Sequence, residues 1–143
     1  MTFIRGALVD GRSVVGISVG AVDWTIDDHL RNKPAAAIAM YHRFVELVER
    51  CGPFTYAVAK TTITLKGTRR GFAGARPTDR SQLVGNFDLQ REARDPRVTS
   101  VSPYTARLFV HHFRVNEIDE LDDDFGTLLS EAYQVGAGAH VAR

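Results

Sequence analysis

The sequence predicts an α+β domain in which an antiparallel sheet of about five strands is flanked by an N-terminal and a C-terminal helix. Two segments carry apolar residues at helical spacing, one after Pro34 and one after Asn116. Between them the spacing changes to an alternation of apolar and polar residues, which is typical of strands with one wet face. The length of 143 residues and the 44% hydrophobic content fit a single domain with a buried core.

Residues 1–23 are expected to form either an extra N-terminal hairpin or a loose arm. Asp10 and Gly11 stand between two valine-containing runs, which is a strong signal for a hairpin turn. Several glycines in the same stretch weaken strand pairing and favour an arm. The sequence leaves both possibilities open.

Two helical segments are expected next. Thr25 and Asp28 have the spacing of a capping box, so a short helical turn should begin there. Pro34 suits the first turn of a longer helix. The apolar stripe of that helix consists of Ile38, Tyr41, Phe44 or Val45, Val48 and Cys51. Gly52 can adopt the left-handed conformation that ends a helix and Pro53 prevents its continuation, so the helix should stop there.

A single strand is expected over residues 54–66, where the residues alternate in character. Ile63 and Leu65 mark the side toward the core. Lys60 and Lys66 then lie on the opposite face, with Lys60 in the middle of the strand.

The remaining strands follow a basic turn over residues 66–70. A short strand is expected around Phe72, and the run at 82–90 places its apolar residues on one face. After a loop, a short strand is expected at 98–101 and the longest late strand at 104–115.

The last element is expected to be a helix capped by Asn116. Its apolar stripe consists of Ile118, Leu121, Phe125, Leu128, Leu129 and Ala132. Acidic residues over 117–124 favour a helix N-terminus, where the macrodipole is positive, and Gly136 should end the helix. The domain therefore spans residues 24–136, and residues 137–143 are expected to be a frayed tail.

Charge and cysteine content exclude several classes of protein. The net charge of +1 gives no overall attraction to nucleic acids or membranes, although the middle of the chain is basic and the end acidic. The lone cysteine, Cys51, rules out an internal disulfide and a cysteine-based zinc site, and it fits a reducing compartment. No apolar run has membrane-spanning length, and charges interrupt the N-terminal residues, unlike a signal peptide. We therefore expect a cytoplasmic protein without a membrane partner.

No metal or cofactor site is predicted. His111 and His112 are neighbours on a strand, so they point to opposite faces and cannot easily share one ion. The acidic run 122–124 fans around a helix axis instead of converging. The stretch GTRRGFAG lacks the strand, spacing and following helix of a phosphate-binding loop.

The candidate binding residues are basic, polar or aromatic: Lys60, Thr62, Lys66, Arg69, Arg70, Phe72, His112 and Arg114. The cluster around Phe72, which Arg76 and Arg80 extend, could hold a phosphate backbone and stack a base. Alternatively, Phe72 packs inward and the arginines form a soluble rim. Lys60 is either an ordinary edge-strand charge or an anchor for an anion.

Short motifs follow one another in a characteristic order between Trp24 and Gln134. They are Asp28-His29, Lys33-Pro34, Gly52-Pro53, Lys60 to Ile63, Phe72, the strand from Leu83 to Leu89, Asp95-Pro96, the histidine-bearing strand, Asp119 and Ala132-Tyr133. This order resembles a small bacterial domain of unknown function. Members of that family occur alone, behind a zinc ribbon, or attached to a predicted restriction-endonuclease-like domain.

The resemblance implies a stand-alone accessory or binding module. The family-like positions are Lys60, Phe72, His111 or His112, and Tyr133. The chain lacks the zinc-ribbon cysteines of some relatives and carries no nuclease domain, so neither activity can be carried over.

Three functions remain open. The first is a binding module that uses the face of Lys60, Lys66, His112 and Arg114 for an anionic partner such as nucleic acid. The second is a small-ligand pocket between sheet and helices. The third is an enzyme in which Lys60 and His112 form an acid–base pair, which requires the two side chains to approach within hydrogen-bond reach. A homodimer through an edge strand is also plausible.

Overall fold

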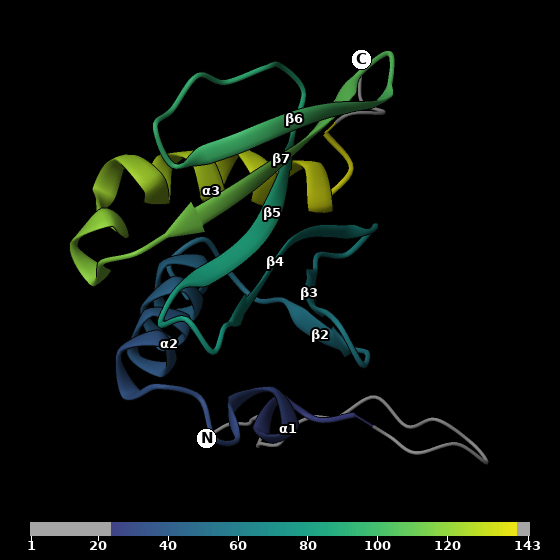
Figure 1. The fold of residues 1–143 in the computed structure, drawn as a ribbon. Coiled ribbons are helices and arrows are strands. Elements are labelled where there is room, and N and C mark those ends of the chain that lie inside the picture. Colours follow the sequence, from purple (N-terminus) through teal and green to yellow (C-terminus); the bar gives the residue numbers. More distant parts are fainter. Residues whose placement is uncertain (1–23, 140–143) are drawn as a thin grey trace.

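The computed structural model describes residues 24–139, which form a six-stranded antiparallel sheet with helices on one face (Figure 1). The α+β class predicted from the sequence is confirmed, with one strand more than expected. In chain order the elements are α1 (Ile26–Leu30), α2 (Ala35–Glu49), β2 (Thr55–Val58), β3 (Ile63–Lys66), β4 (Gly71–Pro77), β5 (Leu83–Leu89), β6 (Val98–Thr105), β7 (Leu108–Val115), the 3-10 helix η1 (Ile118–Glu120) and α3 (Asp123–Gly136). The predicted hairpin or arm at 1–23 and residues 140–143 of the predicted tail lie outside the described residues.

The two N-terminal helices begin where the sequence predicts, whereas α2 ends at Glu49, before the predicted stop at Gly52, and leaves Cys51 outside the helix. The Thr25 hydroxyl accepts from the backbone N–H of Asp28 (3.1 Å), and the Asp28 carboxylate accepts from the N–H of Thr25 (3.0 Å). Pro34 is the residue before α2. Gly52 follows the helix with a φ of +144°, and Tyr133 packs so closely that a side chain at residue 52 would meet its hydroxyl.

The C-terminal helix begins later than predicted, and Asn116 is not its cap. The backbone N–H groups of Asn116 and Glu117 both donate to the carboxylate of Glu120, which closes the short helix η1. The chain then turns, and Asp122 caps α3 by accepting from Phe125 N–H. Ile118 consequently lies outside the apolar stripe and is 45% exposed. The other predicted stripe residues are buried: Leu121, Phe125, Leu128, Leu129 and Ala132.

The predicted single strand over residues 54–66 is wrong, because the segment folds into the hairpin of β2 and β3. Lys60 and Thr61 form its turn, which the hydrogen bond from Ala59 N–H to the Thr62 carbonyl closes (2.9 Å). In this register Val58 pairs with Ile63. The side chain of Val58 therefore shares the buried face with Ile63, whereas an unbroken strand would have turned it to the other face.

The late strands form a second hairpin, in which β6 and β7 are joined by a tight turn at residues 106–107. The predicted strands at 98–101 and 104–115 thus exist with a shifted boundary. The sheet order is β2-β3-β4-β5-β7-β6, so β7 lies between β5 and β6, and the loop from β5 must pass across the sheet end before the chain returns. Within the sheet of residues 24–139, the outermost strands are β2 and β6.

The loop before β6 is fixed by Arg97, whose side chain is only 12% exposed. Its guanidinium donates to both carboxylate oxygens of Asp95 (2.8 and 2.7 Å) and to the carboxylate of Asp122 (2.9 Å). It also donates to the Glu120 carbonyl and lies 5.2 Å from the ring centroid of Phe125. The network joins the β5–β6 loop to the start of α3.

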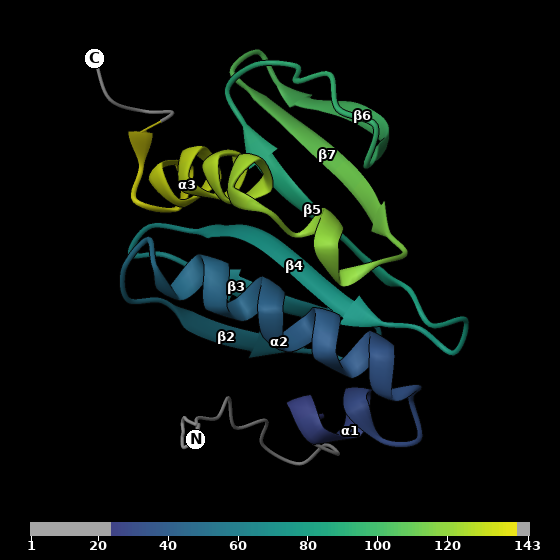
Figure 2. The same ribbon diagram turned by 90° about the vertical axis from the view of Figure 1, so that its left-hand side faces the viewer.

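The core lies between the sheet and helices α2 and α3, which cover the same face (Figure 2). Its centre is a cluster of buried aromatic rings, with centroids 5.1 to 6.4 Å apart, formed by Phe44, Phe87, Phe113 and Phe125. No described helix covers the opposite face of the sheet. Among residues 24–139, no helix combines the length and apolarity that crossing a membrane requires.

Candidate binding surface on the open sheet face

The open face, defined here as the sheet face away from α2 and α3, presents one residue in two along each strand. Register places Thr64, Gly74, Asn86, His112 and Ser100 in one row across five strands. A second row contains Arg76, Val84 and Arg114. The open face is therefore polar and basic, whereas the covered face is apolar.

The positive charges on the open face outnumber the negative ones. Lys66, Arg76 and Arg114 are exposed, and no ion pair joins any of them to another residue within 24–139. Asp88 is the sole acidic residue in strands β2 to β7, and it is 5% exposed. Because its carboxylate pairs with Arg70 (2.8 Å), it offers little compensation to the other cations.

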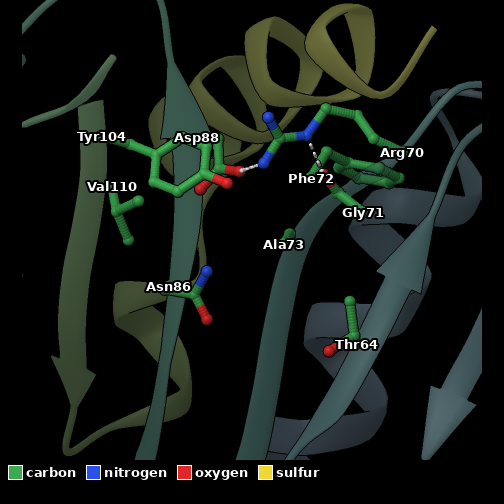
Figure 3. Close-up of a pocket in the computed structure, with 9 residues that line it drawn as sticks. All are labelled: Thr64, Arg70, Gly71, Phe72, Ala73, Asn86, Asp88, Tyr104 and Val110. Atoms are coloured by element: carbon green, nitrogen blue, oxygen red, sulfur yellow. Dashed lines mark hydrogen bonds and ion pairs between the residues drawn. The ribbon is translucent and has the colours of Figure 1, made fainter. Parts of the chain in front are cut away.

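A groove of about 530 Å³ lies on this face between β6 and β4 (Figure 3). Its lining residues are Thr64, Arg70, Gly71, Phe72, Ala73, Asn86, Asp88, Tyr104 and Val110. Arg70 donates through Nε to the Gly71 carbonyl (2.9 Å) and through Nη2 to Asp88 (2.8 Å). The ring of Tyr104 lies 5.6 Å from the guanidinium carbon and is 67% exposed. The groove thus combines a fixed cation with an exposed aromatic ring.

The structure brings together only part of the predicted set. Lys66, His112 and Arg114 lie on the open face and Arg70 borders the groove. Arg69 is exposed in the turn between β3 and β4, where its backbone N–H donates to the Gly136 carbonyl.

Lys60 and Thr62 do not lie in a strand, contrary to the prediction. Both are exposed at the turn between β2 and β3, because the segment reverses there. Strands β4 and β5 separate this hairpin from His112 on β7. With about 4.8 Å between neighbouring strands, the two side chains are too far apart to act as an acid–base pair.

Phe72 is fully buried and cannot stack a ligand from the open face. A β-bulge opposite Leu65 and Lys66 inserts Phe72 as an extra residue in β4. Its ring packs against Tyr133, with centroids 5.3 Å apart, and against Gly136 of α3. Of the two interpretations of this residue, inward packing is the one the structure shows.

The adjacent histidines point to opposite faces, as predicted. His111 is buried and stacks on Phe87 with ring centroids 5.2 Å apart. Its Nε2 accepts from Ala93 N–H (2.8 Å), so the proton of the neutral ring is on Nδ1, which donates to the Phe109 carbonyl (3.0 Å). Burial lowers the pKa of His111, and the charge of Arg91 adds to this effect. His111 is therefore a neutral structural residue.

Acidification should destabilise the protein through His111. Because the folded state disfavours the charged ring, the unfolded chain takes up this proton first as the pH falls below the ordinary value of 6.5. The free energy of unfolding should therefore decrease as the pH falls from 6.5 to the lower pKa of His111 in the folded state. Urea titrations between pH 7.5 and 4.5 would measure this. His111→Gln should flatten the dependence, and the exposed control His112→Gln should not. Equally steep curves for parent and His111→Gln would contradict the assignment.

Neither Cys51 nor a cluster of metal-ligating side chains forms a reactive site within residues 24–139. Burial raises the pKa of the Cys51 thiol, so the thiolate is disfavoured. Within the described part of the chain, no three His, Cys, Asp or Glu side chains come close enough to hold a metal ion.

Sequence reasoning found only Arg70 and Phe72 among the groove residues and missed the others, Asn86, Asp88 and Tyr104 among them. The alternation predicts Tyr104 at the start of one long strand, whereas it lies near the end of the outer strand β6. Pro103 is a signal that could have identified this edge, because proline within a sheet is confined largely to edge strands.

Comparison with protein-family models matches residues 26–136 to a domain of unknown function (DUF5655). Searches of curated proteins and of solved structures found no match to the chain. The family match covers most of the described residues, including helices α1 to α3 and the whole sheet. The chain therefore belongs to the DUF5655 family of domains of unknown function.

Proposed function

We propose that the open face binds single-stranded nucleic acid through its phosphate backbone. The observation that carries the proposal is the placement of Lys66, Arg76 and Arg114 on three different strands of one face, which no described helix covers, without an ion pair among the described residues. Basic side chains that follow a groove, with aromatic side chains on which bases stack, are typical of sequence-tolerant single-strand binding.

The spacing of the cations suits an extended anionic chain. Arg76 and Arg114 flank Val84 in one row, so two strand spacings, roughly 10 Å, separate their backbones. Lys66 lies toward the other end of the face, across the groove. The row that contains Asn86, which lines the groove, lies between Lys66 and the row of Arg76 and Arg114. The sheet supplies neither a protruding helix nor an isolated ribbon to enter the major groove of a duplex, which favours single strands.

The proposal predicts salt-dependent binding that the basic residues control. The parent protein should bind fluorescent single-stranded oligonucleotides at low salt, with affinity falling steeply as salt rises. The variant Lys66→Ala, Arg76→Ala, Arg114→Ala should bind more weakly. The slope of log K against log salt should shrink by about 2, since each phosphate contact on a single strand contributes about 0.7. Fluorescence anisotropy at several salt concentrations would measure both quantities.

A matched control removes the same charge elsewhere. Arg31, Arg50 and Arg91 each make an exposed ion pair, with Asp28, Asp123 and Glu131 respectively, on the helical side of the molecule. Their triple alanine variant should keep the parental slope. Absence of oligonucleotide binding by the folded parent, or equal losses in the two triple variants, would refute the proposal.

A second candidate, a small anionic or aromatic ligand, is supported by the groove volume of about 530 Å³. Ligand sites in proteins commonly fall between about 300 and 1,000 Å³. A thermal-shift screen in which no such compound raises the melting temperature would argue against this candidate.

We further propose that the protein works in the cytoplasm, since a chain with Cys51 as its lone cysteine has no disulfide to form and fits a reducing compartment. A cell-fractionation experiment would test this.

We also propose a homodimer that forms through the edge of β6, because an edge strand presents unpaired backbone groups. Analytical ultracentrifugation that shows a monomer at high concentration would exclude it.

A further inference from the structure

We propose that the groove between β6 and β4 seats one nucleotide of the bound strand, with its base stacked on Tyr104 and its phosphate held by Arg70. This inference rests on the proposed function and adds to it a specific binding site for one nucleotide, called here the nucleotide seat. The sequence-tolerant phosphate contacts of the rest of the face would not by themselves distinguish nucleic acid from another polyanion.

Arg70 is held in position before any ligand arrives. Its Nε donates to the Gly71 carbonyl and its Nη2 to Asp88, so one edge of the guanidinium is occupied. Nη1 makes no hydrogen bond to any residue within 24–139. A guanidinium fixed along one edge presents its remaining donors in a defined direction, which is the arrangement that suits the paired oxygens of a phosphate. Asp88 acts here as a positioning residue.

Tyr104 supplies the stacking surface. It belongs to the edge strand β6, where an irregularity between Pro103 and Thr105 in the pairing with β7 frees it from regular alternation. Its ring is the most exposed large hydrophobic group of residues 24–139. The guanidinium of Arg70 lies 5.6 Å from the ring centroid, so a cation–π contact orients the ring above the groove (Figure 3). An exposed ring held in place loses little further freedom when a base stacks on it.

The groove between these two residues offers room and polar groups. Asn86 leans over Gly74, where its amide oxygen would be 3.4 Å from a Cβ, so the absence of a side chain at residue 74 leaves space beside the amide. An asparagine amide carries both donors and an acceptor and can pair with the edge of a base. The volume of about 530 Å³ is sufficient for one nucleotide.

Substitution of Tyr104 tests the nucleotide seat and should leave the stability of the fold unchanged, because the ring is mostly exposed. Tyr104→Ala should weaken binding of a single-stranded oligonucleotide by about 5- to 150-fold, the usual loss for a stacked base. Tyr104→Phe should bind like the parent. The slope of log K against log salt should stay the same in both, because no phosphate contact is removed. Trp24→Ala, which removes a partly exposed aromatic residue at α1, is the matched control and should have no effect.

An abasic strand of equal length provides the second readout. The parent should bind it more weakly than the base-containing strand by about the factor that Tyr104→Ala costs, and Tyr104→Ala should bind the two strands alike. In parallel, the double variant Arg70→Gln, Asp88→Asn, which leaves no unpaired buried charge, should lower the salt slope by about 0.7.

The outcomes separate the two proposals. If Tyr104→Ala binds like the parent, or if the abasic strand binds as tightly as the base-containing one, the nucleotide seat is refuted while salt-dependent binding by the open face stands. If the folded parent binds no oligonucleotide at low salt, both proposals are refuted.

Discussion

Replacing Arg97 with alanine should lower the free energy of unfolding by about 3–5 kcal/mol, the cost of breaking a buried ion pair from one side. The substitution leaves the carboxylate of Asp95 in a site where its side chain is 13% exposed, without its guanidinium partner. It also removes the hydrogen bonds to Asp122 and to the Glu120 carbonyl, and the contact with the Phe125 ring. Urea denaturation at pH 7 would measure the loss.

The appropriate control is Arg91→Ala, because the ion pair of Arg91 with Glu131 is exposed and such pairs contribute about 1 kcal/mol at most. A loss at Arg97 no larger than the loss at Arg91 would show that the network contributes little. The double variant Arg97→Met, Asp95→Asn should recover part of the stability, since it leaves no buried charge unpaired.

The loss in the free energy of unfolding caused by Arg97→Ala should also depend on pH in a defined direction. Hydrogen bonds from Arg97 lower the pKa of Asp95, and the backbone N–H of Phe125 together with Arg97 lowers that of Asp122. Carboxylates with depressed folded-state pKa values stabilise the fold above their unfolded pKa of about 4 and lose this contribution as the pH falls through the folded-state values. The difference between parent and Arg97→Ala should therefore shrink in acid.

The second large effect is expected at Gly85, where alanine should cost about 3 kcal/mol, the upper end for overpacking. A Cβ at residue 85 would collide with the backbone of the neighbouring strand β4, at the Gly74 carbonyl oxygen and the Ala75 Cα. Neither atom can move without disturbing the ladder between β4 and β5. The loss would appear in the same urea titration.

The same substitution at Gly126 should have the opposite sign. Gly126 lies within α3, and a Cβ there would meet only the end of the Leu47 side chain at 3.4 Å. Alanine in a helix interior is favoured over glycine by about 0.5–1 kcal/mol. A destabilised Gly126→Ala, or a Gly85→Ala as stable as the parent, would contradict the packing described for these two glycines.

The helices could be predicted well because their signals are local. The capping box at Thr25 depends on atoms three residues apart, and the stop that follows α2 depends on the backbone conformation of Gly52. The cap of α3 was predicted at Asn116, because nothing local in the sequence shows that Glu120 first accepts two backbone N–H groups. Which of two nearby residues caps the helix therefore depends on the path of the chain after β7.

The hairpin of β2 and β3 could not be separated from one long strand by alternation alone. An even run of alternating residues has the same pattern with or without a turn at Lys60, which is neither glycine nor proline. Phe72 illustrates the same limit, since a bulge moves a side chain to the other face without altering the composition of the strand. The basic character of the face was predictable, whereas the groove depends on strand order.

The insertion of β7 between β5 and β6 also determines when contacts form during folding. The hairpin of β6 and β7 is local, but its docking onto β5 must close the intervening loop, which slows this step. Until docking occurs, β5 is an edge strand whose backbone could pair with another nascent chain. Asp88 lies on the open face of that strand, and a charged side chain on an edge strand deters such pairing. The acid that later orients Arg70 would thus first protect the growing sheet from aggregation.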